Sequence, residues 1–177
     1  MTNLVCHSFL KHRPSQMGRE EFVALFGPVF EHSYWIAMQA WDIGLTHGED
    51  TAASLLSSLI DVVEEAGHGP QLALLRGHPD LAGRVSCRVD LTGASQKEQV
   101  DAGLEDCSAS EFYVFQELNL RYIKKFGFPF ILAVRGRHRS EILKIFRDRL
   151  EHEVTDEFVE ALQQVYQIAF LRLCEIE

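Results

Sequence analysis

Residues 50–66 read DTAASLLSSLIDVVEEA, and the apolar side chains of this stretch recur at steps of three and four residues. Leu55, Leu59 and Val63 mark the repeat, which places them on one face of a helix. Asp50 and Thr51 stand directly before the run, and short polar side chains of this kind cap helix N-termini. The stretch therefore predicts an amphipathic helix with one buried face.

A helical period also governs most of the remaining chain. Helices are expected at about 17–26, 29–41, 71–76, 110–125, 138–151 and 155–175, and a further helix begins at Ser95. Glycine and proline residues, such as the pair Gly27-Pro28, separate these segments, because both residues interrupt helices. Residues 81–93 contain two glycines and no clean period, so we expect an irregular loop there.

The segment 128–134, FPFILAV, is the one stretch with a strand-like composition. A lone strand cannot form a sheet, so we expect an extended segment that lies against helices. The sequence thus predicts an all-α fold, built as a single compact multi-helix domain over residues 1–177. Residues 1–18 are expected to form a less ordered N-terminal arm.

Length and charge narrow the class of protein. The 177 residues suffice for one domain that needs no disulfide or metal for stability. Lys and Arg number 17 against 26 Asp and Glu, and this net charge of −9 argues against a general nucleic-acid binder. The four cysteines form no CxxC pair and are interpreted as reduced thiols. Without a signal-peptide pattern or a long apolar run, we expect a cytoplasmic protein that does not span a membrane.

The tripeptide His78-Pro79-Asp80 stands between two expected helices. Proline favours the first turn of a helix, which would place His78 beside a helix N-terminus and the positive end of its dipole. That end disfavours an imidazolium, so His78 is a candidate general base, which must be neutral near pH 7. The alternative is a linker histidine that only starts a helix.

Two further candidates have structural alternatives. Ser95 and Glu98 have the spacing of a capping box, which accounts for both residues, and a surface amide at Gln99 needs no functional reason. Arg172 leans toward the apolar stripe of the last helix. Such an arginine either extends to solvent along its own methylene groups or points into a cleft, where the guanidinium binds an anion.

Common catalytic motifs are missing from the sequence. The eight histidines include no HExxH spacing, which a zinc hydrolase would favour. A glycine-rich phosphate loop with its lysine is also missing, and so is the GxSxG turn of the α/β-hydrolases. Local motifs alone therefore leave the reaction class open.

A set of short blocks, in this order, carries a family resemblance: FEHSYW (30–35), HPDLAG (78–83), SQKEQ (95–99), LNLRYIKKFGFPFI (118–131), and RL at 149–150 and 172–173. Each block alone is modest, but their order and spacing together are specific. The chain resembles the 2-oxo-4-hydroxy-4-carboxy-5-ureidoimidazoline (OHCU) decarboxylases of urate degradation. The resemblance extends from about residue 19 to the end of the chain.

The resemblance implies a carboxy-lyase that converts OHCU to (S)-allantoin, as an all-helical homodimer without a metal or an organic cofactor. The family's catalytic histidine and glutamate map to His78 and Glu98. Its substrate contacts map to Pro79, Ser95, Gln99, Phe130, Ile131, Leu132, Ala133, Val134 and Arg172. The implied partner is the small substrate, with no nucleic acid and no membrane.

The chemistry of OHCU suits these residue types. Its carboxylate is attached to a carbon beside a ring C=N bond, and this imine can accept the electrons that CO2 leaves behind. An imidazole, a carboxylate and a guanidinium in one cavity would transfer protons and stabilise the developing charge. Two alternatives are a non-catalytic helical interaction module and a metal-dependent hydrolase of a small cyclic ureide.

Overall fold

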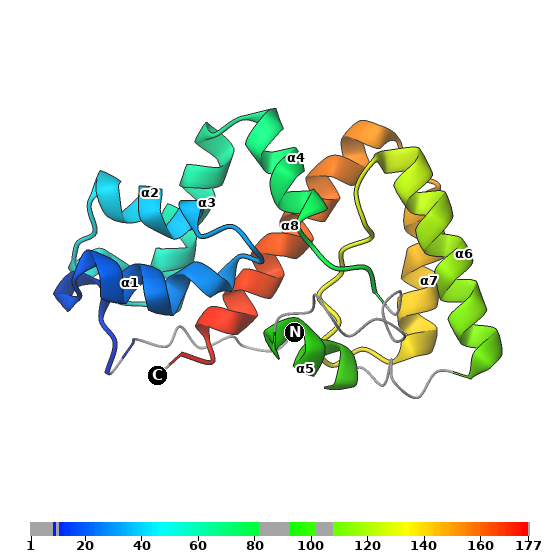
Figure 1. Ribbon diagram of the computed structural model, residues 1–177, viewed down its shortest axis with the longest axis horizontal. Coiled ribbons are helices and arrows are strands. Elements are labelled where there is room, and N and C mark those ends of the chain that lie inside the picture. The colour runs from blue at the N-terminus through cyan, green and yellow to red at the C-terminus, as the bar shows by residue number, and fades with distance from the viewer. Residues whose placement is uncertain (1–8, 10, 82–92, 102–107, 177) are drawn as a thin grey trace. The chain divides into compact units, whose positions relative to one another are not determined.

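The structure is a computed structural model that describes residues 9, 11–81, 93–101 and 108–176. Within these ranges every regular element is a helix, which confirms the all-α prediction (Figure 1). The chain divides into two compact units, here called the first unit (Met1–Leu74 with Tyr166–Glu177) and the second unit (Leu75–Val165). Most of the expected loop at 81–93 lies outside the described residues, because these omit 82–92.

The first unit is built mainly from the N-terminal helices. Its α-helices are α1 (Arg19–Phe26), α2 (Trp35–Ile43), α3 (Ala52–Glu65), α4 (His68–Arg76) up to residue 74, and α8 (Val154–Leu173) from residue 166. Short 3-10 turns occupy Pro14–Gln16, Gly27–Val29 and His47–Glu49. The helix α2 contacts both α1 and α3, and buried apolar side chains of all three helices contribute to the core of this unit.

The stretch at 50–66 forms α3, as its spacing predicts. Thr51 is the N-cap, and its Oγ1 accepts a hydrogen bond from the Ser54 N–H at 3.2 Å. Leu55 and Leu59 on the predicted face are fully buried. Burying a leucine side chain contributes roughly 1.5–3 kcal/mol, so this face anchors the helix.

The described part of the N-terminal segment packs on this core. Phe9 is buried, with its ring centroid 5.3 Å from that of Phe26 on α1. The Ser15 N–H and hydroxyl both donate to the Asp50 carboxylate, at 3.0 and 2.8 Å. Phe9 and Ser15, which lie within the expected N-terminal arm, are therefore anchored to the first unit.

Two helix boundaries differ from the expected ones. α2 begins at Trp35 rather than near residue 29, because the 3-10 turn at Gly27–Val29 and a left-handed residue, His32 (φ 50°), break the chain direction. α4 begins at His68 rather than at 71, since Pro70 is tolerated in the first turn of a helix.

The second unit contains α5 (Gly93–Asp101), α6 (Ala109–Phe126), α7 (Arg139–Leu150) and the first part of α8. α6 and α7 lie side by side (Figure 1). Ser108 and Glu111 form a capping box at the start of α6, and Gly127 ends the helix in the left-handed conformation (φ 80°). Both ends of this long helix are therefore capped.

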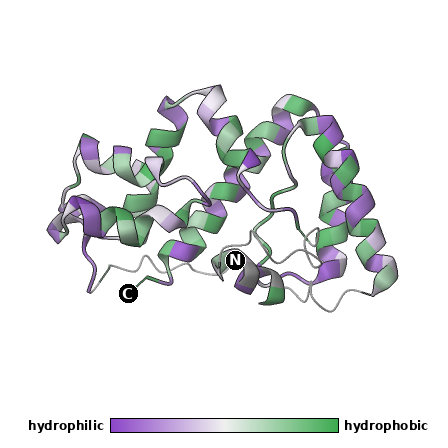
Figure 2. Cartoon of the chain, in the orientation of Figure 1, coloured by the Kyte–Doolittle hydropathy of each residue, from purple (hydrophilic) through white to green (hydrophobic). Residues whose placement is uncertain are grey.

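The segment between α6 and α7 is extended, as expected. Residues 129–134 have no regular structure, and Phe130 to Val134 are at most 4% exposed. Figure 2 shows this connection in the hydrophobic colour for most of its length. Its aromatic rings join those of the neighbouring helices: Tyr122 packs edge-to-face on Phe130, and Phe130 stacks on Phe146 at 3.8 Å between centroids.

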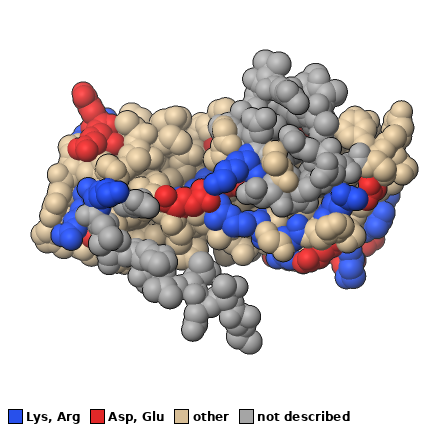
Figure 3. Space-filling view, turned by 90° about the horizontal axis from the view of Figure 1, so that it is seen from below, with Lys and Arg blue, Asp and Glu red and all other residues tan. Residues whose placement is uncertain are grey.

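The surface of the second unit mixes charges of both signs. On the face drawn in Figure 3, basic and acidic side chains are interspersed near α7. Lys144 pairs with Asp148 at 2.8 Å within α7, at the i, i+4 spacing that suits helical ion pairs, and Arg137, which precedes α7, pairs with Glu141. None of the described helices combines the length and the apolar run that a membrane span requires.

Candidate functional site

His78 follows the end of α4 rather than preceding a helix. α4 ends at Arg76, and the His78 N–H donates to the Leu75 carbonyl at 3.2 Å. The expected helix-start position is therefore wrong, since residues 79–81, which follow His78, are not helical. The dipole argument for a neutral imidazole does not apply, but His78 is only 8% exposed, unlike an ordinary linker histidine.

A pocket of about 260 Å³ opens beside this turn, in the second unit. Asp80 lines it from the turn, and the described residues that line it from α6 are Gln116, Asn119, Leu120 and Ile123. The Asn119 Nδ2 donates to the Leu81 carbonyl at 2.9 Å, so the turn is bonded to α6.

α5 carries the second block of candidate residues. The helix begins at Gly93, so Ser95 lies inside its first turn and the expected capping box at Ser95 and Glu98 is wrong. Ser95 is 5% exposed and Glu98 is half-buried. The side chain of Gln99 lies outside the described part of the chain.

The segment 130–134 is fastened through its backbone. The Ile131 carbonyl accepts from the Arg149 Nη1 at 2.7 Å. The Ala133 N–H donates to the Gln164 Oε1 at 3.0 Å. Backbone groups in the expected substrate-binding segment are thus partly engaged by side chains of α7 and α8, which fix its conformation.

A buried ion pair contacts this segment through Arg149. The Arg149 Nε donates to the Glu157 Oε1 at 2.9 Å, and the guanidinium stands over the Phe130 ring at 4.7 Å from its centroid. The same carboxylate accepts from the Tyr122 hydroxyl, and its Oε2 lies 2.8 Å from the His152 Nδ1. Burial, together with the bond to Glu157, raises the pKa of Tyr122, so its hydroxyl stays protonated and donates.

Arg172 is buried in the last turn of α8, with 6% exposure. Its Nη1 donates to the Glu31 Oε2 at 2.9 Å and to the Val29 carbonyl at 3.3 Å. The solvent-extended alternative is therefore wrong. The guanidinium in this structure therefore binds a carboxylate of the protein itself, that of Glu31. The next residue, His32, has a left-handed backbone conformation.

The pairing of Glu31 with Arg172 makes a testable prediction. Glu31→Leu or Arg172→Met alone leaves one buried charge without its partner, whereas the double variant leaves none. In urea unfolding, we expect the double variant to lose less free energy of unfolding than the two single variants lose together, by about 0.5–3 kcal/mol. Strictly additive losses would contradict a direct pair.

The expected residues fall in both units. His78, Pro79, Ser95, Glu98 and the segment 130–134 belong to the second unit. Arg172 belongs to the first. The meeting of His78, Glu98 and Arg172 in one cavity therefore stays a prediction.

Among the further buried polar residues, four had no role assigned from the sequence: Glu31, Asn119, Arg149 and Glu157. A signal for Glu157 exists along α8, where Ala161, Val165 and Ile168 form a buried stripe. Glu157 precedes this stripe and Arg172 follows it at the same helical spacing. A charge on such a stripe needs a partner, and each of these residues has one.

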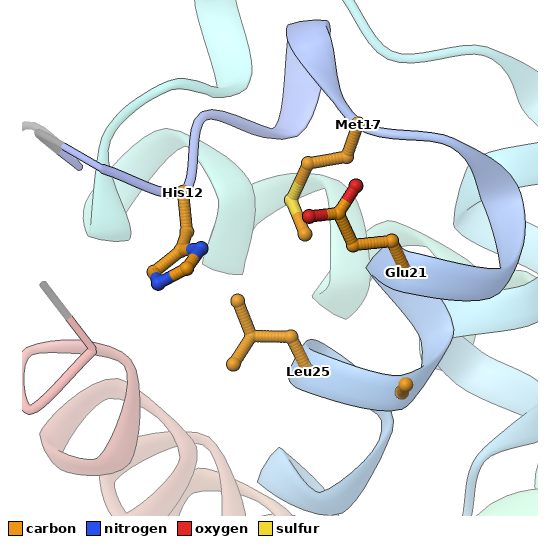
Figure 4. Close-up of a pocket in the computed structure, with 5 residues that line it drawn as sticks. His12, Met17, Glu21 and Leu25 are labelled. Atoms are coloured by element: carbon orange, nitrogen blue, oxygen red, sulfur yellow. The ribbon is translucent and has the colours of Figure 1, made fainter.

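A second pocket, of about 300 Å³, lies in the first unit (Figure 4). The described residues that line it are His12, Met17, Glu21, Ala24 and Leu25, and the predicted site residues are not among them. In the described ranges, no cluster of three or more His, Cys, Asp or Glu side chains is arranged to hold a metal ion.

Comparison with known proteins identifies the family. The sequence profile of the OHCU decarboxylases matches residues 15–174. The chain belongs to the OHCU decarboxylase family. It is 36% identical over 169 residues to the 2-oxo-4-hydroxy-4-carboxy-5-ureidoimidazoline decarboxylase of Haloferax volcanii, covering 96% of each chain. The family resemblance of the short sequence blocks is thereby confirmed.

Solved structures agree with the fold of this family. A crystal structure of (S)-allantoin synthase matches with a TM-score of 0.72 and 28% identity, over 90% of this chain and half of that chain's length. A crystal structure of OHCU decarboxylase in the presence of (S)-allantoin matches with a TM-score of 0.64 over 90% of this chain and 97% of that one. At 24% identity, the second likeness concerns the fold alone.

Proposed function

We propose that this protein is a carboxy-lyase that converts OHCU to (S)-allantoin in urate degradation. The match to the OHCU decarboxylase family over residues 15–174 carries the proposal. The burial of His78, two residues before Asp80 of the second-unit pocket, supports it. The residues His78, Glu98 and Arg172 are assigned roles through the family motifs that contain them.

The reaction moves one electron pair and one net proton. The bond between the ring carbon and the carboxylate breaks, CO2 leaves, and the electron pair forms a ring C=C bond as the imine nitrogen takes a proton. The hydroxyl proton then departs, the C=O bond forms, and the neighbouring carbon receives a proton. Because the imine is the electron acceptor, the substrate itself supplies the function that a carbanion-stabilising cofactor serves elsewhere.

The roles of the side chains follow from these steps. His78 and Glu98 exchange protons with the hydroxyl and with the ring, from one face of the intermediate. Arg172 binds the carboxylate or the enolate oxygen that develops, and Glu31 holds its guanidinium. The segment 130–134, with Pro79 and the Ser95–Gln99 block, contacts the ureide groups.

The proposal is tested by CO2 release from fresh OHCU, with and without the protein. We expect release well above the spontaneous rate, in proportion to protein concentration. The spontaneous rate in the presence of folded protein would contradict the proposal.

Glu98→Gln tests the carboxylate as a proton carrier. The amide is isosteric but cannot carry a proton, so kcat is expected to fall about 10²-fold. Glu117→Gln makes the same change on an exposed residue of α6 and should leave kcat as in the wild type. Nearly normal turnover in Glu98→Gln would remove this residue from proton transfer.

The active form is a homodimer in the cytoplasm. Light scattering on the purified protein should give twice the chain mass of 20.2 kDa. A monomer with full decarboxylase activity would contradict the dimer as the active form.

A further inference from the structure

The turn that carries His78 is fastened to α6 on both sides, within the second unit. Before the turn, the Arg76 Nε donates to the carbonyl of Gly127, directly after the end of α6, at 2.9 Å. After the turn, the Asn119 Nδ2 donates to the Leu81 carbonyl at 2.9 Å. His78 thus lies between two hydrogen bonds that tie its segment to one helix.

Asn119 is the more rigid of these two anchors. Its side chain is 5% exposed, whereas Arg76 is exposed. It lies in the middle of α6, with the buried Phe115 and Tyr122 one turn away on either side. Leu81, whose carbonyl it binds, is also buried. A buried donor on a helix that is capped at both ends leaves the carbonyl little freedom to move.

The Asn119 Oδ1 also indicates why an asparagine stands at this position. Among the described side chains, the Asn119 Oδ1 is the buried polar atom that has no hydrogen-bond partner. An unpaired buried acceptor destabilises the folded state, and a leucine of similar size would remove it. Stability of α6 alone therefore does not explain an asparagine here. What the amide contributes is the hydrogen bond from its Nδ2 to Leu81.

We propose that Asn119 is a positioning residue, which sets the place of the His78 imidazole by holding Leu81. The inference rests on the proposed role of His78 in proton transfer. Leu81 is three residues from His78, and a shift of about 1 Å in a catalytic group can lower the rate about 10²-fold. Asn119 itself contacts neither substrate nor a reacting atom in this proposal.

The test compares Asn119→Leu with Gln163→Leu. Both replace an amide by leucine in the second unit, and Gln163 is an exposed residue of α8 that lines neither pocket. In the ligand-free protein, the imidazole resonances of His78 are followed by NMR and assigned by their loss in His78→Gln. In parallel, kcat and KM are measured with OHCU.

For Asn119→Leu we expect shifted His78 resonances and a kcat lowered about 10–100-fold. KM should change less than about threefold, because substrate contacts remain. Gln163→Leu should match the wild type in all three readouts. Should Asn119→Leu fail to fold, Asn119→Ser, which shortens the side chain, is measured in the same way.

Two results overturn the inference. One is an Asn119 variant with unchanged His78 resonances, whatever its activity, because the residue then does not act through His78. The other is shifted resonances with an unchanged kcat in an active enzyme. If the wild type lacks decarboxylase activity, the proposed function fails, and the resonances still decide whether Asn119 holds the His78 turn.

Discussion

Replacing His78 with alanine is expected to lower kcat/KM for OHCU by about 10²–10⁴-fold, the usual contribution of a positioned acid or base. His78 is buried, stands two residues before Asp80 of the second-unit pocket, and belongs to the HPDLAG block that carries the family resemblance. Its loss removes a proton carrier while the α4 end and the Asn119 anchor remain. The effect is measured by steady-state kinetics on the variant.

The control for this variant is His12→Ala. His12 is an exposed histidine that lines the separate pocket of the first unit. It should keep wild-type kinetics, and both variants should keep the far-UV circular dichroism of the wild type. If folded His78→Ala turns over OHCU as fast as His12→Ala does, His78 has no part in the chemistry.

Arg149→Met is expected to lower the free energy of unfolding by about 3–5 kcal/mol, because it removes the guanidinium that pairs with the buried Glu157 carboxylate. The carboxylate is 0% exposed, so water cannot replace the lost partner. The variant also loses the bond to the Ile131 carbonyl, and with it one tie on the segment 130–134. Urea unfolding, read from the midpoint and slope, measures the change.

Arg121→Met provides the matched control on the surface of α6. Arg121 is 58% exposed and pairs with Glu117 at 3.9 Å, a contact worth at most about 1 kcal/mol. Equal destabilisation by the two variants would show that the buried pair does not hold the second unit together. A double variant, Arg149→Met with Glu157→Leu, should recover part of the loss, because it leaves no unpaired buried charge.

Helix periods predict which segments are helical, because the buried faces repeat at the spacing of the helix. The leucines of α3 and the breaks at Gly27 and Gly127 were predictable for this reason. Helix starts are less predictable. The pattern Ser-x-x-Glu occurs at both 95–98 and 108–111, yet only the second forms a capping box among the described residues, since α5 already begins at Gly93.

The residues of the candidate site were also predictable only in part. Short blocks that resemble a family point to His78 and Glu98, because the order and spacing of such blocks are visible in a single sequence. The partners that hold such residues come from distant segments, as with Asn119 to Leu81 or Arg172 to Glu31, which lie 38 and 141 positions apart. Such pairings depend on tertiary packing, which periodicity along one helix does not encode.

The stereochemistry of the product tests the decarboxylase activity most directly. The planar intermediate that follows CO2 loss accepts a proton on either face in free solution, so spontaneous decay yields racemic allantoin. Circular dichroism of fresh OHCU mixed with the protein should therefore show a growing signal of the (S) enantiomer, which His78→Ala does not produce. A racemic product at the spontaneous rate, with folded wild-type protein present, would contradict the activity.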